Sequence, residues 1–203
     1  MIRIFIILTI SLILNSCCSF DKKDLEFDNQ ELRHFADYET GDTIFFESNS
    51  GNIDTIKIMG YENEKFDNCG GLISRQPSNT RWVTIKHLPK DKWHGTSQDM
   101  TKEAEIEIDY QGLLWISKYP IGKTIQYNID FKDFHSTTDS LIGQFNTGPL
   151  ELNNLTLTNY YKVQHGYPER IKDSTEIEVV YWTDQDGLVA YRNKGGEIWT
   201  KKK

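Results

Sequence analysis

The chain has 203 residues, of which 26% are charged, and a formal net charge of −7 at pH 7. This length supports one substantial hydrophobic core or two small ones. An acidic chain lacks the clustered lysine and arginine that a nucleic-acid surface needs, so we expect no nucleic-acid partner.

The first twenty residues have the layout of an export signal. Arg3 and the amino terminus supply positive charge, residues 4–14 are apolar, and the small polar residues Asn15 and Ser16 follow. The alternative is a transmembrane helix. An eleven-residue helix, however, spans only about 17 Å of a hydrocarbon core that is roughly 30 Å thick. The sequence therefore predicts a cleaved signal over 1–16.

Leu14-Asn15-Ser16-Cys17 resembles the lipobox of bacterial lipoproteins, although Asn15 departs from the usual Ala, Ser or Thr. The resemblance implies that Cys17 becomes the first mature residue and carries several acyl chains, which anchor a protein stably to a membrane. It also implies a cell-envelope location, in the outer membrane because no aspartate follows the cysteine. The alternative is an ordinary secreted protein with two incidental cysteines.

Residues 17–42 are rich in charge and predict a tether. Within it, Asp28 or Asn29 could cap a short helix that Gly41 would end. If Cys17 is acylated, Cys18 and Cys69 remain as a pair, and a disulfide between them is left open.

From residue 43 onward the hydrophobic pattern has period two. Residues 103–110 (EAEIEIDY) and 124–131 (TIQYNIDF) alternate without error, so each has one buried and one solvated face as a strand. Less strict runs lie at 43–48, 53–59, 81–88, 113–118, 153–163, 176–183, 187–192 and 196–200. Such alternation is typical of antiparallel sheets.

Turn-forming residues separate these runs. They are Ser50-Gly51-Asn52, Gln111-Gly112, Pro120-Ile121-Gly122, Asp186-Gly187 and Gly195-Gly196. With about ten strands and no long helix, residues 43–203 predict a single antiparallel all-β domain; a half-barrel, a barrel and a sandwich all stay open.

Few residues have the spacing of a metal site. His87, Asp91 and His94 are the one compact set, but His87 shares the inward parity of Val83 and Ile85, which favours a structural histidine. Asp184 to Gly187 resembles the start of a calcium loop, yet a hairpin turn explains it better because strand residues follow at once. We expect no metal and no cofactor.

The chain also lacks the local signatures of catalysis. It has no G-x-S-x-G elbow and no glycine-rich phosphate loop before a helix. Glu103, Glu105 and Glu107 fall on a solvated face. Among aromatic residues, Trp82 points away from its apolar neighbours and Trp93 lies in the polar loop 89–101, so these two are the contact residues we expect.

A further resemblance concerns modification. Exported proteins of the Bacteroidota carry O-glycans at Asp-Ser/Thr followed by an aliphatic residue or Thr, and this pattern occurs at Thr43, Thr55, Ser140 and Ser174. Residue frequencies alone would give about one match. The last fifty or so residues also resemble small uncharacterised lipoproteins of that phylum, a likeness that implies no activity.

Together these features predict an envelope lipoprotein that binds a protein, glycan or lipid without catalysis. The alternatives are an assembly subunit of an envelope complex and an envelope hydrolase. A carrier would have an apolar cavity, whereas an assembly or interaction protein would have a filled core and an exposed apolar patch.

Overall fold

A computed structural model describes residues 21–35, 38–66, 77–88, 111–120, 122, 124–139 and 142–202. Several predictions fall outside these ranges and remain predictions: those for Cys17, Cys18, Cys69, Asp91, Trp93, His94, Ser140 and the run 103–110.

Within the described residues, eleven strands form one antiparallel sheet in the order β6-β5-β4-β3-β2-β1-β13-β12-β11-β10-β7. The strands are β1 (Thr43–Ser48), β2 (Ile53–Phe66), β3 (Ser78–Leu88), β4 (Gln111–Tyr119), β5 (Thr124–Phe131), β6 (Phe134–Asp139), β7 (Gln144–Asn146), β10 (Tyr160–Gln164), β11 (Ile177–Thr183), β12 (Gly187–Asn193) and β13 (Ile198–Lys201). A separate hairpin joins β8 (Leu150–Leu152) to β9 (Leu155–Leu157).

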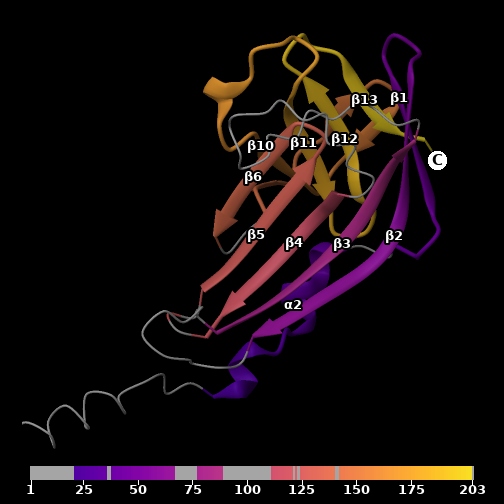
Figure 1. Ribbon diagram of the computed structural model, residues 1–203. Coiled ribbons are helices and arrows are strands. Elements are labelled where there is room, and N and C mark those ends of the chain that lie inside the picture. The colour runs from indigo at the N-terminus through magenta and orange to yellow at the C-terminus, as the bar shows by residue number, and fades with distance from the viewer. Residues whose placement is uncertain are drawn as a thin grey trace, which may run out of the picture.

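The sheet curls into a half-barrel. Figure 1 shows β2–β6 as one wall, with β10–β13 on the other side of the curl. The prediction of an antiparallel all-β fold is confirmed, and the half-barrel is the correct one of the three architectures left open.

Alternation predicted the strands best where one face is apolar. β1 and β5 have the bounds expected from the sequence, and Tyr127, Ile129 and Phe131 are buried on one face of β5. β6 was not predicted because its buried positions include Ser136, where other strands place apolar residues.

One predicted turn is wrong. Gln111 and Gly112 begin β4 and pair with Ile85 and Thr84 of β3, next to a shift in register. Gly112 is required there because the Trp115 indole lies directly over it, where a Cβ atom would overlap the ring. The glycine therefore marks a close contact within a strand, and a close approach of this kind is a recognised role of strand glycines.

The segment before β1 packs against the sheet. It contains the 3₁₀ helices η1 (Lys22–Leu25) and η2 (Arg33–Phe35) and the short helix α2 (Asn29–Leu32). Asp28 caps α2 and exchanges side-chain to backbone hydrogen bonds with Glu31, as the sequence led us to expect for one of two candidate caps. No helix among the described residues is long and apolar enough to cross a membrane.

This segment fills the concave side of the half-barrel. Leu25, Phe35 and Tyr38 are buried, and Phe35 and Tyr38 belong to the same apolar cluster as the inward residues of the sheet. That cluster includes Phe46, Ile58, Val83, Leu114, Ile129, Phe131, Val163, Trp182 and Tyr191. The described interior is therefore a packed core.

Candidate functional site

The two ends of the sheet approach each other along what we call the seam, the gap between β6 on one side and residues 143–144 and 162–164 on the other. Among the strands that the structure describes, β6 pairs with β5 alone. β7 pairs with residues 160–162 of β10, which leaves Val163 and Gln164 beyond its end. At one point the seam is closed, where the Gly166 N–H donates to the His135 carbonyl at 2.7 Å.

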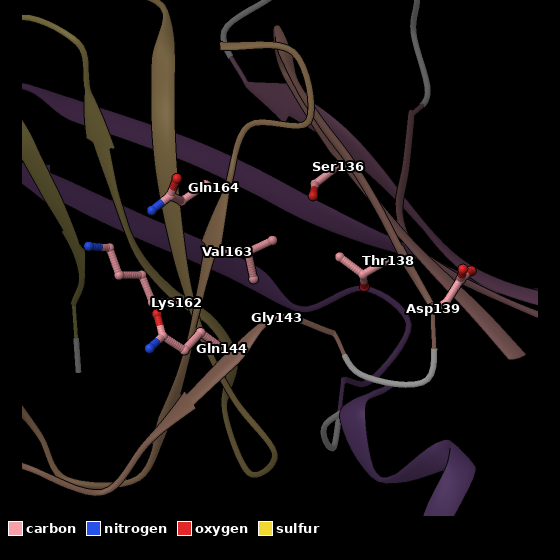
Figure 2. A pocket seen from close by; sticks show the side chains of 8 residues that line it. All are labelled: Ser136, Thr138, Asp139, Gly143, Gln144, Lys162, Val163 and Gln164. Carbon is pink, nitrogen blue, oxygen red and sulfur yellow. The ribbon is translucent and has the colours of Figure 1, made fainter.

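A pocket of about 390 Å³ occupies the seam. It is lined by Ser136, Thr138, Asp139, Gly143, Gln144, Lys162, Val163 and Gln164. Figure 2 shows Ser136 and Thr138 on β6 facing Val163 on β10 across the gap. The lining offers hydroxyl, amide, carboxylate and ammonium groups around one apolar side chain, so it suits a polar ligand.

The pocket exists because small residues occupy positions on both sides of the seam. Ser136 and Thr138 pair with Ile129 and Tyr127 of β5, so they occupy inward positions of the sheet. On the other side, a Cβ atom at Gly143 would lie 2.7 Å from Val163 Cγ2. Gly143 therefore lets the chain pass close to β10.

Two exposed aromatic side chains flank the pocket without lining it. Phe145 is 48% exposed and follows Gln144, with its ring 5.0 Å from that of Tyr161. Tyr167 is 40% exposed, and its ring lies parallel to that of His135 at 5.9 Å, with the Arg170 guanidinium 4.2 Å from its centroid. These rings offer apolar contact area at the borders of the seam.

None of the eight residues that line the pocket is a histidine or a cysteine, so no imidazole base stands beside Ser136 among them. Within the part of the chain that the structure describes, no three His, Cys, Asp or Glu side chains gather as a metal site.

A buried histidine forms a second cluster, which the sequence analysis missed. His34 Nδ1 lies 2.7 Å from Asp184 Oδ1, and the His34 ring meets the edges of Tyr127 and Tyr161 at 5.0 and 4.9 Å. Burial lowers the pKa of His34, while the hydrogen bond that the imidazole donates to Asp184 opposes that shift. Asp184 also lies 3.9 Å from the Arg33 Nε atom.

The imidazole of this cluster is enclosed by the fold, whereas its partner Asp184 is partly exposed. The His34 side chain is only 1% exposed, and a general base must reach the proton that it removes. The His34 carbonyl accepts a hydrogen bond from Trp182 Nε1 at 2.8 Å, which fixes the residue further. Burial also raises the pKa of Tyr127 to about 12, so this phenol stays neutral at physiological pH.

An ion pair lies at the other end of the half-barrel. Lys132 Nζ is 3.0 Å from Asp54 Oδ2, which also accepts a hydrogen bond from the Tyr191 hydroxyl at 2.7 Å. Asp54 is buried, and the Lys132 ammonium lies 5.8 Å from both the Tyr191 and Trp199 ring centroids. The pair ties the β5–β6 turn to β2 and β12.

The residues predicted from sequence are scattered. Trp82 is half-buried on the outer face and stacks on Trp115 at 4.7 Å, directly opposite it in the ladder, far in sequence from the seam residues. His87 bonds Gln111 at 3.1 Å and packs against Phe131, as expected for a structural histidine. Asp184 to Asp186 form the β11–β12 hairpin turn, which confirms that interpretation.

The predicted glycan acceptors differ in accessibility. Thr43 and Ser174 are exposed, at the start of β1 and in the turn before β11. Thr55 is half-buried in β2, and Asp54 beside it belongs to the buried ion pair with Lys132.

No family model, no curated protein and no solved structure matches this chain.

Proposed function

We propose that this chain is a lipid-anchored protein of the bacterial cell envelope, in the outer membrane, that binds a partner without catalysis in the seam of its half-barrel. The observation that carries the proposal is the polar pocket between β6 and β10, built from Ser136, Thr138 and Val163 at inward positions. At this edge of the sheet, hydroxyl groups occupy inward positions directly opposite Ile129 and Tyr127 of the neighbouring strand.

The filled core favours a partner that is a protein or a glycan over a lipid cargo. A lipid carrier needs an apolar cavity large enough for acyl chains. Here Phe35 and Tyr38 occupy the concave side, and all but two of the residues that line the seam pocket, Gly143 and Val163, carry a polar group on the side chain. The described part of the chain thus supports recognition at the seam over transport inside the half-barrel.

The anchor would hold the domain close to the membrane. Asp21 is four residues after Cys17, so the link between the acylated cysteine and the packed segment spans at most about 14 Å. Lys118 Nζ, at the end of β4, donates to the Glu26 carbonyl at 2.7 Å, and Gln126 of the adjacent strand pairs with Asp139 of β6. The Asp139 end of the seam therefore lies at the same end of the sheet as the start of the packed segment.

The anchor is tested by metabolic labelling of the full chain with a radioactive or alkyne-bearing palmitate. We expect label in the wild type and in Cys18→Ala, and none in Cys17→Ala. Equal labelling of wild type and Cys17→Ala would contradict the anchor, without bearing on the seam.

The seam is tested by placing a photoreactive amino acid at position 138 of the full chain in its native envelope. We expect a discrete crosslinked species at position 138 and none at position 156, an exposed threonine of β9. A pocket-filling variant, Ser136→Leu, should abolish the adduct while the protein stays folded by circular dichroism. The same adduct at both positions would contradict binding in the seam.

A further inference from the structure

We infer that the occupant of the seam is an extended peptide segment of a partner protein, which pairs with the outer edge of β6 as an added strand. The inference rests on the proposed function and makes it specific. The evidence for it is the direction in which the backbone N–H and C=O groups of β6 point.

One backbone group on the outer edge of β6 already has a hydrogen-bond partner within the chain. The His135 carbonyl points away from β5 and accepts the Gly166 N–H at 2.7 Å. Backbone groups alternate in direction along a strand, so those of Thr137 and Asp139 point into the seam as well. Residue 166 thus begins the pairing that an added strand would continue toward Asp139.

Terminal strands are templates for such pairing. A sheet edge presents a row of backbone donors and acceptors to any extended chain, and β-strand addition obtains affinity from the main chain and specificity from alternate side chains. β6 is the terminal strand at one end of the sheet. On the facing side, β7 pairs only with residues 160–162 of β10, so Val163 and Gln164 line the seam beyond its end.

The pocket specifies what the added strand carries. Its inward side chains would meet Ser136, Thr138 and Val163, so small or β-branched residues fit there. Its outward side chains would lie near Asp139 and Lys162, one charge of each sign, so charged residues of both signs fit there. The expected pattern is alternation of a β-branched residue with a charged one.

A glycan fits less well. Sugar rings pack on aromatic faces, and no aromatic side chain is among the eight residues that line the pocket. Phe145 and Tyr167 flank it from outside the lining. A sugar also has no row of donors and acceptors at the spacing of a strand.

The test is an NMR titration of the full mature chain, ¹⁵N-labelled in detergent micelles, with a defined probe. The probe is a capped heptapeptide in which valine alternates with lysine and glutamate. Its twin carries N-methyl groups on alternate residues, which remove backbone donors and keep the side chains. We expect saturable shifts of the Thr137 and Asp139 amides with the probe, and binding at least about tenfold weaker with the twin.

A matched pair of variants tests the edge itself. Thr137 is exposed, and its N–H points into the seam, so Thr137→Pro removes one donor without breaking the ladder to β5. Thr137→Val changes the side chain and keeps that donor. We expect Thr137→Pro to lower the affinity for the probe about tenfold or more. Thr137→Val should change that affinity less than about twofold. Unchanged amide shifts on β5 confirm that each variant is folded.

The outcomes separate the two proposals. Equal binding of the probe and its twin, or equal binding by both variants, would overturn strand addition. Absence of any shift with the peptide would also overturn it. If a photocrosslink at position 138 still forms in the envelope, binding in the seam stands with a different ligand; if it does not, the proposed function fails too.

Discussion

His34 Nδ1 and Asp184 Oδ1, separated by 150 residues in sequence, lie 2.7 Å apart and join the segment before β1 to the β11–β12 turn. The contact locks η2 against the sheet, because the imidazole is buried between the edges of Tyr127 and Tyr161. The charged groups that face it are Asp184 and Arg33.

This contact predicts a pH dependence of stability. Burial lowers the pKa of His34 from its ordinary 6.5, so the unfolded chain binds a proton more readily than the folded one. The free energy of unfolding therefore keeps its full value above about pH 6.5. Below that pH it falls by up to about 1.4 kcal/mol per pH unit, until the pKa of His34 in the folded state is passed.

Urea unfolding between pH 7.5 and 5.5 measures this dependence. We expect the free energy of unfolding of the wild type to fall across the range, and that of His34→Gln to fall less steeply. Identical slopes for wild type and His34→Gln would show that another group carries the effect.

A hydroxyl group connects the same segment to β12. The Leu188 N–H donates to the Tyr38 hydroxyl oxygen at 2.8 Å, and both residues are buried. Tyr38→Phe leaves that N–H without its acceptor, at a cost of about 1–3 kcal/mol. Thermal or urea unfolding should show this loss, whereas Tyr167→Phe, at an exposed ring, should change stability by less than about 0.5 kcal/mol. Equal effects would contradict the role of the bond.

The stacked tryptophans give an optical test of the β4 geometry. Trp115 stacks on Trp82 with an interplanar angle of 17°, and its indole covers Gly112. Gly112→Ala should displace Trp115 and diminish the exciton signal of the pair in circular dichroism. Gly148→Ala, where a Cβ atom meets nothing within 4 Å, should leave the spectrum unchanged. A normal spectrum for Gly112→Ala would refute the close contact.

The sequence predicted strands wherever burial is one-sided. β1 and β5 were found to the residue because alternation directly reflects which face is buried. β6 was not predicted because its inward positions are occupied by Ser136 and Thr138, so the alternation of apolar and polar residues is missing there. The turn predicted at Gly112 is wrong because glycine occurs in turns but also allows a ring to lie close to a strand.

No local sequence pattern predicts the candidate site. The seam joins residues 136–139 to residues 143–144 and 162–164, and only the curl of the whole sheet brings them together. His34 meets Asp184 for the same reason. The pair Thr137-Thr138, whose β-branched side chains favour strands, was a weak signal for β6.

We propose that a partner occupies the β6 edge in the cell, and hydrogen–deuterium exchange of the full chain would detect that partner. Amide exchange of residues 134–139 would be compared between native envelope membranes and the purified protein in micelles, with the β8–β9 hairpin as internal control. We predict exchange at Thr137 and Asp139 slower by about tenfold or more in the envelope, because each amide gains a partner in the seam. Equal exchange of these amides in both samples would contradict the claim.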